Sequence, residues 1–434
     1  MGTGQINKAR AVHSEYSVRN GEAMKLFVAT RELKRDEFNL LEHIPVNPTA
    51  FIRAGDGIVG WGESARIESR ASGNRIHELS RRWKQLVAEA SIDDSLQLPG
   101  TGLVAFGTFA FSDSSNFAST LIVPKVILGS RDGRVWLTTI SESANNPVHE
   151  DMNFWDKPIE YKDSGEIKFS NGIVSPAKFK TLVASAISEI ANGKFEKIVL
   201  SRDIEAQIDS NFDVRKALKI LATNYPTCWI YSVDGMFGAS PELLVRVSHS
   251  QVSARVLAGT AGRGTDPGVD QAIAQALAES AKNSAEHAFA VDSLVKALEP
   301  FCKHVDADPK PFSLALPNLW HLASDVYGVL SEESSVIDLA ASLHPTAAVA
   351  GTPTSIAQTE IEKLEQNDRG RYAGPVGWLG ADGDGEWAIA LRGAQIEGSK
   401  IRAFAGCGIV AGSEPEAELE ETELKFRPIR EALS

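Results

Sequence analysis

Short runs with the composition of β-strands, joined by tight Asp-Gly turns, recur along much of the chain. They include 51–61 around Asp56-Gly57, 119–139 across Asp132-Gly133, and 228–239 across Asp234-Gly235. Asp-Gly between two apolar runs is typical of a two-residue hairpin turn, which joins antiparallel strands. The chain is therefore expected to form antiparallel sheet rather than the parallel sheet of alternating strands and helices.

Fewer segments have the apolar spacing of an amphipathic helix. The clearest is 179–190, where apolar residues recur at i, i+3, i+4, i+7, i+8 and i+11. A final helix is expected from about Ser413, because Ser413 and Glu416 have the spacing of a capping box and Pro415 lies in the first turn. Other helices are expected at 77–90, 268–298, 336–343 and 356–366. Strands and helices together predict an α+β fold.

The length and charge of the chain limit its organisation and its partners. Its 434 residues change in composition near 145–175, which suggests a boundary between 1–170 and 171–434. The formal net charge of −13 makes nucleic acid and anionic membranes poor partners. An anionic ligand would need local positive charge from Lys, Arg or a metal ion. Three cysteines without a CxxC pair, no secretory signal and no long apolar run predict a cytoplasmic protein.

Three charged residues lie on one face of the predicted final helix. Glu418, Glu421 and Lys425 are spaced i, i+3 and i+7, which places two carboxylates and one ammonium side by side. Glu286, on the predicted helix 268–298, follows Asn283 by one turn. Carboxylates from two helices suit Mg²⁺, whereas a solvated charged surface is the commoner meaning of such spacing.

Lys197 and Glu242 stand at the beginnings of apolar strands. Lys197 is either an edge residue that reaches solvent or a partly desolvated amine that could act as a base. Glu242 follows Pro241 and could be a protonated general acid if it is buried. The segment 405–412, with glycines at 406 and 408, is expected to be a loop before the final helix whose N–H groups could bind an anion. Its GxGxxxG spacing is a weak dinucleotide signal, and the surrounding hairpin turns argue against that alternative.

Eight motifs in the second half of the chain resemble those of the chorismate-utilising enzymes. They are KIVLSR (197–202), SPELLVRV (240–247), LAGTAGRG (257–264), SAKNSAEH (280–287), LHPTAAVAGTP (343–353), DRGRYAGPVGW (368–378), ALRGA (390–394) and AGCGIVAGSEPEAELEETELK (405–425). So many motifs in one order make the resemblance specific. It implies two antiparallel β-sheets packed together and flanked by helices, as in anthranilate synthase component I. It also implies that 171–434 is the catalytic region and that 1–170 completes the body.

The resemblance implies roles for individual residues. Lys197 is implied to activate water as a base, and Glu242 to protonate the departing hydroxyl as an acid. Glu286, Glu418 and Glu421 are implied to hold Mg²⁺. Contacts with the substrate chorismate are implied for Gly259, Thr260, His321, Ala348, Tyr372, Arg392, Gly406, Gly408 and Lys425.

Three positions favour one branch of this family. Relatives that use ammonia resemble one another in having glutamine where Lys197 stands, and those that bond covalently to the ring have lysine where Ala258 stands. Salicylate and anthranilate formers tend to have threonine where Ala348 stands. The resemblance therefore implies an isochorismate synthase that adds water at C2 of chorismate and expels the C4 hydroxyl, for menaquinone or siderophore synthesis.

Two alternatives to this function remain open. A salicylate synthase, which goes on to eliminate pyruvate, would use the same scaffold. A chorismate-binding protein without turnover is the third reading, and the presence of both Lys197 and Glu242 argues against it. We expect a monomer.

Overall fold

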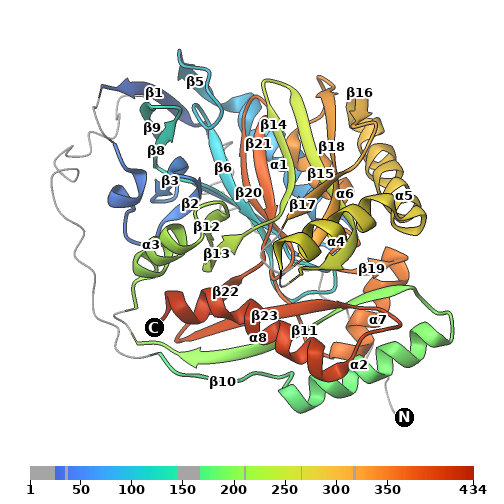
Figure 1. Cartoon of the computed structure of the whole chain (residues 1–434). Helices are drawn as coiled ribbons and strands as arrows, with labels where there is room; N and C mark the ends of the chain where they lie inside the picture. Colours follow the sequence, from blue (N-terminus) through green and yellow to red (C-terminus); the bar gives the residue numbers. More distant parts are fainter. Residues whose placement is uncertain (1–24, 35–37, 145–166, 210–211, 265, 316–318) are drawn as a thin grey trace, which may run out of the picture.

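The computed structural model describes residues 25–34, 38–144, 167–209, 212–264, 266–315 and 319–434, without the side chains of Thr260, Lys282, Glu286 and Leu319. Within these residues the strands form two large sheets, which Figure 1 shows side by side with helices around them. All strand pairs are antiparallel except β1 with β5. The predicted α+β fold with two antiparallel sheets is confirmed in its architecture.

The larger sheet contains 13 of the described strands. Their order is β10 (Phe169–Asn171), β11 (Lys197–Gln207), β23 (Lys400–Ile409), β22 (Gly393–Glu397), β13 (Met236–Ser240), β12 (Trp229–Val233), β2 (Thr49–Arg53), β3 (Asp56–Trp61), β8 (Val126–Arg131), β9 (Arg134–Ser141), β1 (Phe27–Leu33) and β5 (Ser91–Asp94), with β19 (Gly351–Thr352) also on β11.

The smaller sheet contains ten described strands. Their order is β16 (Cys302–Ala307), β18 (Leu319–Leu330), β15 (Gln251–Gly262), β14 (Leu243–Ser248), β21 (Gly385–Ile389), β20 (Pro375–Gly380), β6 (Val104–Thr108), β7 (Ser119–Val123) and β4 (Ala65–Ser69), with β17 (Phe312–Ala315) also on β18. Both sheets combine strands from 1–170 with strands from 171–434. The predicted boundary segment lies largely outside the described residues, so that division stays a prediction.

Eight α-helices are described, and they cover the outer faces of the sheets. They are α1 (Arg75–Glu89), α2 (Pro176–Ala191), α3 (Val214–Asn224), α4 (Pro267–Glu279), α5 (Ala281–Leu298), α6 (Val336–Leu343), α7 (Thr354–Glu365) and α8 (Pro415–Ala432). Helices α3 and α8 lie on the larger sheet, and α5 packs on β15 and β18 of the smaller sheet (Figure 1). In the part of the chain that the structure describes, no helix combines the length and hydrophobicity that crossing a membrane requires.

Two clusters of buried apolar side chains hold these layers together. The first joins side chains of both sheets, including Trp136 and Tyr231 of the larger sheet and Phe106 and Trp387 of the smaller one. The second lies between the larger sheet and the helices α3 and α8, where Phe426 is buried. Burial of this apolar surface is the main favourable term in folding and fixes the position of α8 against β23.

Three details of the predicted elements are wrong. The helix expected at 268–298 is two helices, because Ser280 has extended backbone and its Oγ accepts a hydrogen bond from Asn283 N, which begins α5. The segment expected as a loop from 405 continues as β23 to Ile409. The capping box is absent: Glu414 precedes α8, and Ser413 Oγ accepts from Val410 N instead. Strands β16, β17 and β18 and helix α3 were not predicted.

Candidate active site

Lys197 and Glu242 meet in one cluster of charges. Lys197 begins β11, and its side chain lies over Gly408 of the neighbouring β23, where an added methyl group would come 2.7 Å from Lys197 Cε. Desolvation raises the pKa of Glu242 above that of an ordinary carboxyl, while Lys197, Arg392 and Lys425 oppose this shift electrostatically. The carboxyl therefore holds its proton more tightly than usual although three cations surround it.

The glycines of β23 make room for polar groups above the strand. A methyl group on Gly406 would lie 3.1 Å from the Tyr372 hydroxyl oxygen. Tyr372 is buried and stacks on Phe404, and burial raises its pKa to about 12. The carbonyl of Gly406 accepts a hydrogen bond of 2.7 Å from Lys425 Nζ. Gly406 and Gly408 thus line one side of the charged cluster from a strand, not from the loop that was predicted.

Helix α8 carries Glu418, Glu421 and Lys425 on one face, as their spacing predicted, and Lys425 reaches β23. Lys425 Nζ forms an ion pair with Glu421, and Cys407 Sγ of β23 donates to the backbone carbonyl of Glu418. Among the described residues, Oε2 of Glu418 is buried without a hydrogen-bond partner. A buried carboxylate oxygen without a partner is energetically costly and is suited to a cation.

A bulge in β15 lies beside this cluster. The pairing of β15 with β18 shifts register between Ala258 and Thr260, and Gly259 adopts φ +80°. His321 of β18 pairs with Thr260. Desolvation lowers the pKa of His321, a hydrogen bond to the Gly259 backbone opposes that shift, and the charge of Lys197 adds to it. Gly259, His321 and Lys197 are therefore neighbours.

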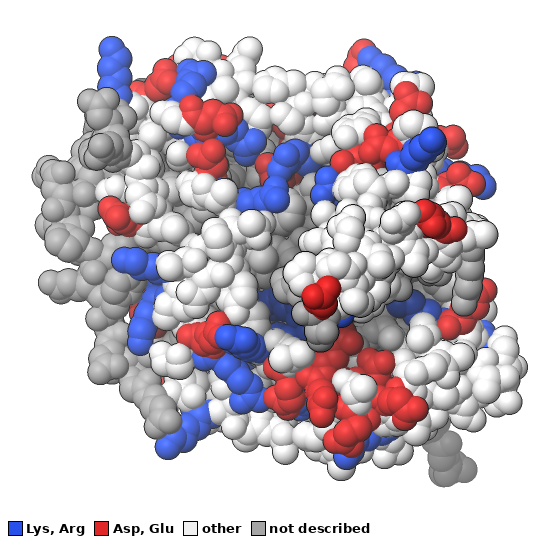
Figure 2. Space-filling model, viewed as in Figure 1, with Lys and Arg blue, Asp and Glu red and all other residues white. Residues whose placement is uncertain are grey.

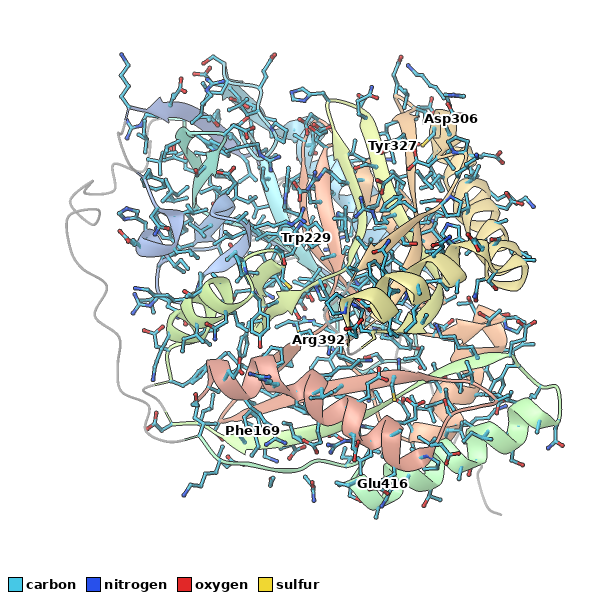
Figure 3. All side chains as sticks on the ribbon, viewed as in Figure 1. Phe169, Trp229, Asp306, Tyr327, Arg392 and Glu416 are labelled. Atoms are coloured by element: carbon cyan, nitrogen blue, oxygen red, sulfur yellow. The ribbon has the colours of Figure 1, made fainter. Side chains whose placement is uncertain are left out.

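Arg392 lies between β21 and β22, near the centre of the molecule (Figure 3). Its backbone adopts φ +49°, which is uncommon for a residue other than glycine. Desolvation lowers the pKa of its guanidinium, and the charges of Tyr372, Glu421 and Glu242 oppose the shift. Arg392 thus faces both the acid at 242 and the acidic face of α8.

Ala348 lies on the segment between α6 and β19, and its side chain is exposed. This segment leads into Thr352, which pairs with Lys197. The side chains of Glu286 and Thr260 lie outside the described residues, so their predicted roles stay predictions. Among the described side chains, no group of three or more His, Cys, Asp or Glu lies close enough to hold a metal ion.

A buried ion pair that was not predicted from the sequence supports the strand of Lys197. Glu365 and Arg369 are almost completely buried and form a bidentate pair. Glu365 Oε1 accepts from Ser201 N at 2.7 Å, and Arg369 donates to the carbonyls of Val199 at 2.7 Å and Val349 at 3.1 Å. The pair fills the gap along β11 between its contacts with β10 and β19. The four-residue spacing of Glu365 and Arg369 was the only sequence signal for it.

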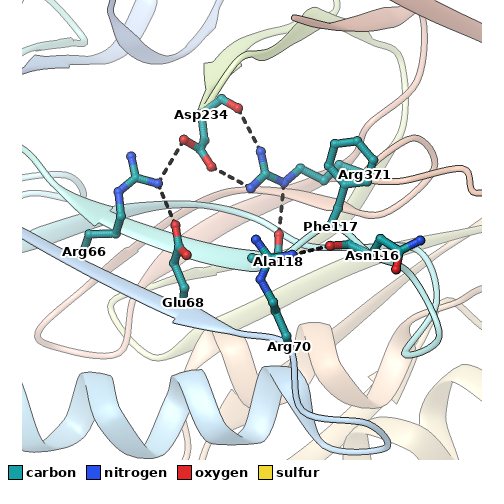
Figure 4. A pocket seen from close by; sticks show the side chains of 8 residues that line it. All are labelled: Arg66, Glu68, Arg70, Asn116, Phe117, Ala118, Asp234 and Arg371. Carbon is teal, nitrogen blue, oxygen red and sulfur yellow. Dashed lines mark hydrogen bonds and ion pairs between the residues drawn. The ribbon is translucent and has the colours of Figure 1, made fainter. Parts of the chain in front are cut away.

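A separate pocket of about 430 Å³ is lined by residues that include Arg66, Asp234 and Arg371 (Figure 4). Three of its charged groups form ion pairs: Asp234 binds Arg66 at 3.0 Å and Arg371 at 2.6 Å. None of the predicted site residues lines it. The Asp234–Arg371 pair joins the turn between β12 and β13 to the residue before Tyr372. The charged groups of this pocket therefore stabilise the position of those two segments.

The surface over α8 is acidic. Asp and Glu side chains gather there in Figure 2, and the exposed glutamates of α8 include Glu416, Glu420 and Glu423. Lys197, Arg392 and Lys425, by contrast, are each only partly exposed. An acidic protein of net charge −13 thus has a local cluster of partly buried cations, which an anionic ligand needs.

The chain resembles known proteins in sequence and in fold. A family model for chorismate binding enzymes matches residues 13–434. Isochorismate synthase DhbC of Bacillus subtilis (strain 168) is 37% identical over 297 residues, covering 64% of this chain and 75% of that enzyme. The solved structure of MenF, the menaquinone-specific isochorismate synthase from Escherichia coli, has a TM-score of 0.74 at 24% identity and covers 94% of this chain and 95% of its own.

The fold is also shared with an enzyme that is named for a different product, anthranilate. Anthranilate synthase component I from Streptococcus pneumoniae TIGR4 has a TM-score of 0.67 at 23% identity, covering 92% of this chain and 95% of its own. These two solved structures establish the architecture, and the family model and the sequence identity to DhbC establish the kinship. The chain belongs to the family of chorismate binding enzymes.

Proposed function

We propose that this chain is an isochorismate synthase, which converts chorismate to isochorismate. The observation that carries the proposal is the single charged cluster in which an amine, Lys197, and a carboxyl with a raised pKa, Glu242, lie beside Arg392 and Lys425. A base and an acid on one anion-binding site are what hydroxyl exchange on a dianionic ring requires. The family membership and the identity to DhbC support the same function.

The reaction balances with these two residues alone as proton carriers. Lys197, as the neutral amine, takes a proton from water while the water oxygen bonds to ring carbon C2 and the ring double bonds shift. The C4–O bond breaks, and Glu242 gives its proton to the departing oxygen, which leaves as water. Proton exchange with solvent then returns Lys197 to the amine and Glu242 to the acid before the next turnover. The raised pKa of Glu242 keeps that proton available at higher pH than an ordinary carboxyl would.

The remaining residues would bind and orient the substrate. Arg392 and Lys425 would pair with the two carboxylates, and their charges acting on Glu242 support this assignment. Backbone N–H groups near Gly259, Thr260, Gly406 and Gly408 would add hydrogen bonds. The Tyr372 hydroxyl, the His321 ring and the Ala348 methyl group would complete the pocket.

We also propose Mg²⁺ as the cofactor, held by Glu286, Glu418 and Glu421. The fit rests on the buried, unpartnered Oε2 of Glu418, a ligand atom of the kind that Mg²⁺ prefers. When bound, the ion would supply positive charge next to a substrate carboxylate. Calorimetric titration with Mg²⁺ tests the site: Glu418→Gln should weaken binding at least about 10-fold. Glu416→Gln, on the exposed part of the same helix, should not, and equal affinities would reject the site.

Product analysis after incubation with chorismate and Mg²⁺ tests the function. We expect isochorismate, and mainly salicylate with pyruvate would instead identify a salicylate synthase. Lys197→Ala and Glu242→Gln should each lower turnover by at least about 100-fold. The partly exposed Lys180, which pairs with Glu416, supplies a control in Lys180→Ala. Undiminished rates in the two site variants would reject the mechanism.

We place the enzyme in the cytoplasm as a monomer that binds chorismate and no nucleic acid or membrane. The three cysteines are free thiols, which suits a reducing compartment. Size-exclusion chromatography with light scattering tests the monomeric state, which a mass of two chains would contradict.

A further inference from the structure

The bulge in β15 is enclosed on two sides. A methyl group on Gly259 would lie 3.3 Å from Asn283 Cβ of α5 and 3.4 Å from Leu322 Cδ1 of β18. Gly259 itself is buried and adopts φ +80°, which a larger residue would adopt only under strain. The backbone of the bulge is therefore confined between a helix and a neighbouring strand.

A buried histidine ties these three elements together. His287 of α5 is 2% exposed, with Nδ1 3.0 Å from the carbonyl oxygen of Ala258 and Nε2 2.9 Å from Ser324 Oγ of β18. Because a carbonyl oxygen only accepts, Nδ1 must carry a hydrogen in either charge state of the ring. His287 therefore donates to Ala258, the first residue of the bulge.

This contact controls the direction of the next backbone N–H group. The carbonyl of Ala258 and the N–H of Gly259 belong to one planar peptide unit, in which they point in opposite directions. Holding the carbonyl toward α5 therefore fixes the Gly259 N–H away from α5. On the next residue, His321 of β18 forms a hydrogen bond with the Gly259 backbone. Two histidines from different elements thus hold consecutive residues of the bulge.

We propose that His287 is a positioning residue, which orients the peptide between Ala258 and Gly259 for contact with the anionic substrate. The proposal rests on the proposed function, in which the bulge backbone binds chorismate. His287 touches no substrate and acts only through the Ala258 carbonyl. Its bond to Ser324 anchors the ring but does not transmit the effect.

Two substitutions separate the two bonds of this ring. Asparagine places an amide N–H at the position of Nδ1, so His287→Asn keeps the hydrogen bond to Ala258 and loses the hydrogen bond to Ser324. The amide of glutamine reaches the position of Nε2, so His287→Gln keeps the hydrogen bond to Ser324 and loses the hydrogen bond to Ala258. We expect KM for chorismate to rise at least tenfold in His287→Gln and less than threefold in His287→Asn, with smaller changes in kcat.

Thermal unfolding of both variants provides the structural control. Each variant loses one hydrogen bond and the ring, so their midpoints should fall by similar amounts. A residue that serves stability alone would shift KM equally in both, and equal KM values would overturn the proposal.

Ser324→Ala gives a test that does not depend on the glutamine variant folding. It removes the partner of Nε2 and leaves the Ala258 bond, so KM should stay within threefold of wild type even if stability falls. A tenfold rise in KM would overturn the proposal. If the wild-type protein itself formed no isochorismate from chorismate, the proposed function would be rejected, whatever the variants show.

Discussion

At the scale of single residues, the side chain of Lys197 depends on the absence of one at Gly408. The added methyl group of Gly408→Ala would come 2.7 Å from Lys197 Cε, the far end of a flexible chain that can move aside. We expect kcat to fall by about 100-fold, because a displacement of about 1 Å is enough for such a loss. The free energy of unfolding should change by less than about 1 kcal/mol. Steady-state kinetics and chemical denaturation measure the two effects.

Gly412→Ala is the matched control for this substitution. It adds the same methyl group a few residues further along the chain, where no atom lies within 4 Å. Its kcat should equal that of the wild type. An unchanged kcat in Gly408→Ala would mean that Lys197 does not need its present position.

The pKa of Glu242 predicts how stability depends on pH. Desolvation raises it above the ordinary value of 4.5, so the folded protein holds this proton more tightly than the unfolded chain. The wild type therefore loses stability as pH rises from 4.5 through the raised pKa, at about 1.4 kcal/mol per pH unit between them. Glu242→Gln cannot ionise, so its stability relative to wild type should be greater at pH 8 than at pH 5. Urea denaturation at both pH values measures the difference, and an equal difference would contradict it.

At the scale of elements, β11 is held by side chains where it lacks a neighbouring strand. Arg369→Met would leave the Glu365 carboxylate buried without its cation, which costs about 3–5 kcal/mol. The double variant Arg369→Met/Glu365→Leu removes both charges and should lose less stability than the single variant. Chemical denaturation of both variants measures which of them has the lower free energy of unfolding. If the double variant were the less stable one, the buried charge would not be the cause.

Elements were predicted well where apolar periodicity alone decides them. Helix α2 (Pro176–Ala191) contains the predicted segment 179–190, and its buried residues Phe179, Leu182, Val183 and Ala186 recur at helical spacing. The break at Ser280 was missed because both flanking segments are helical and only the side-chain bond to Asn283 N separates them. Gly406 and Gly408 suggested a loop because glycine weakens strands, whereas here the close approach of Tyr372 and Lys197 requires them.

The same reasoning explains which parts of the site the sequence could reveal. The face of α8 followed from spacing, because helix geometry alone brings Glu418, Glu421 and Lys425 together. The bonds of Arg369 to Val199 and of His287 to Ala258 could not be predicted, because the partner in each is a backbone carbonyl. Because every residue has a backbone carbonyl, a hydrogen bond to one cannot be recognised from the sequence.

At the scale of the whole molecule, neither sheet is complete in the second half alone. A fragment of residues 171–434 would lack β4, β6 and β7 of the smaller sheet and would expose the edge of β12 in the larger one. We expect this fragment to show no cooperative thermal transition by circular dichroism, and co-expression with 1–170 to restore one. A fragment that melts cooperatively and turns over chorismate would contradict this expectation.

The order of strands was the part of the fold that patterns could not supply. Asp-Gly turns identified antiparallel neighbours in sequence, such as β12 with β13. Pairings between distant strands, such as β11 with β23, depend on which edges and apolar faces meet in the folded chain. The spacing of residues along the chain contains no information about which distant strands pair.

The pairing of β2 with β12 shapes how the chain must be made. Ile52 pairs with Ile230, so a ribosome that adds 5–20 residues per second completes β12 on the order of ten seconds or more after β2. Until then the hydrogen-bonding edge of β2 is open to other nascent chains. The enzyme's yield in a cell is thus set partly by what shields that edge during translation.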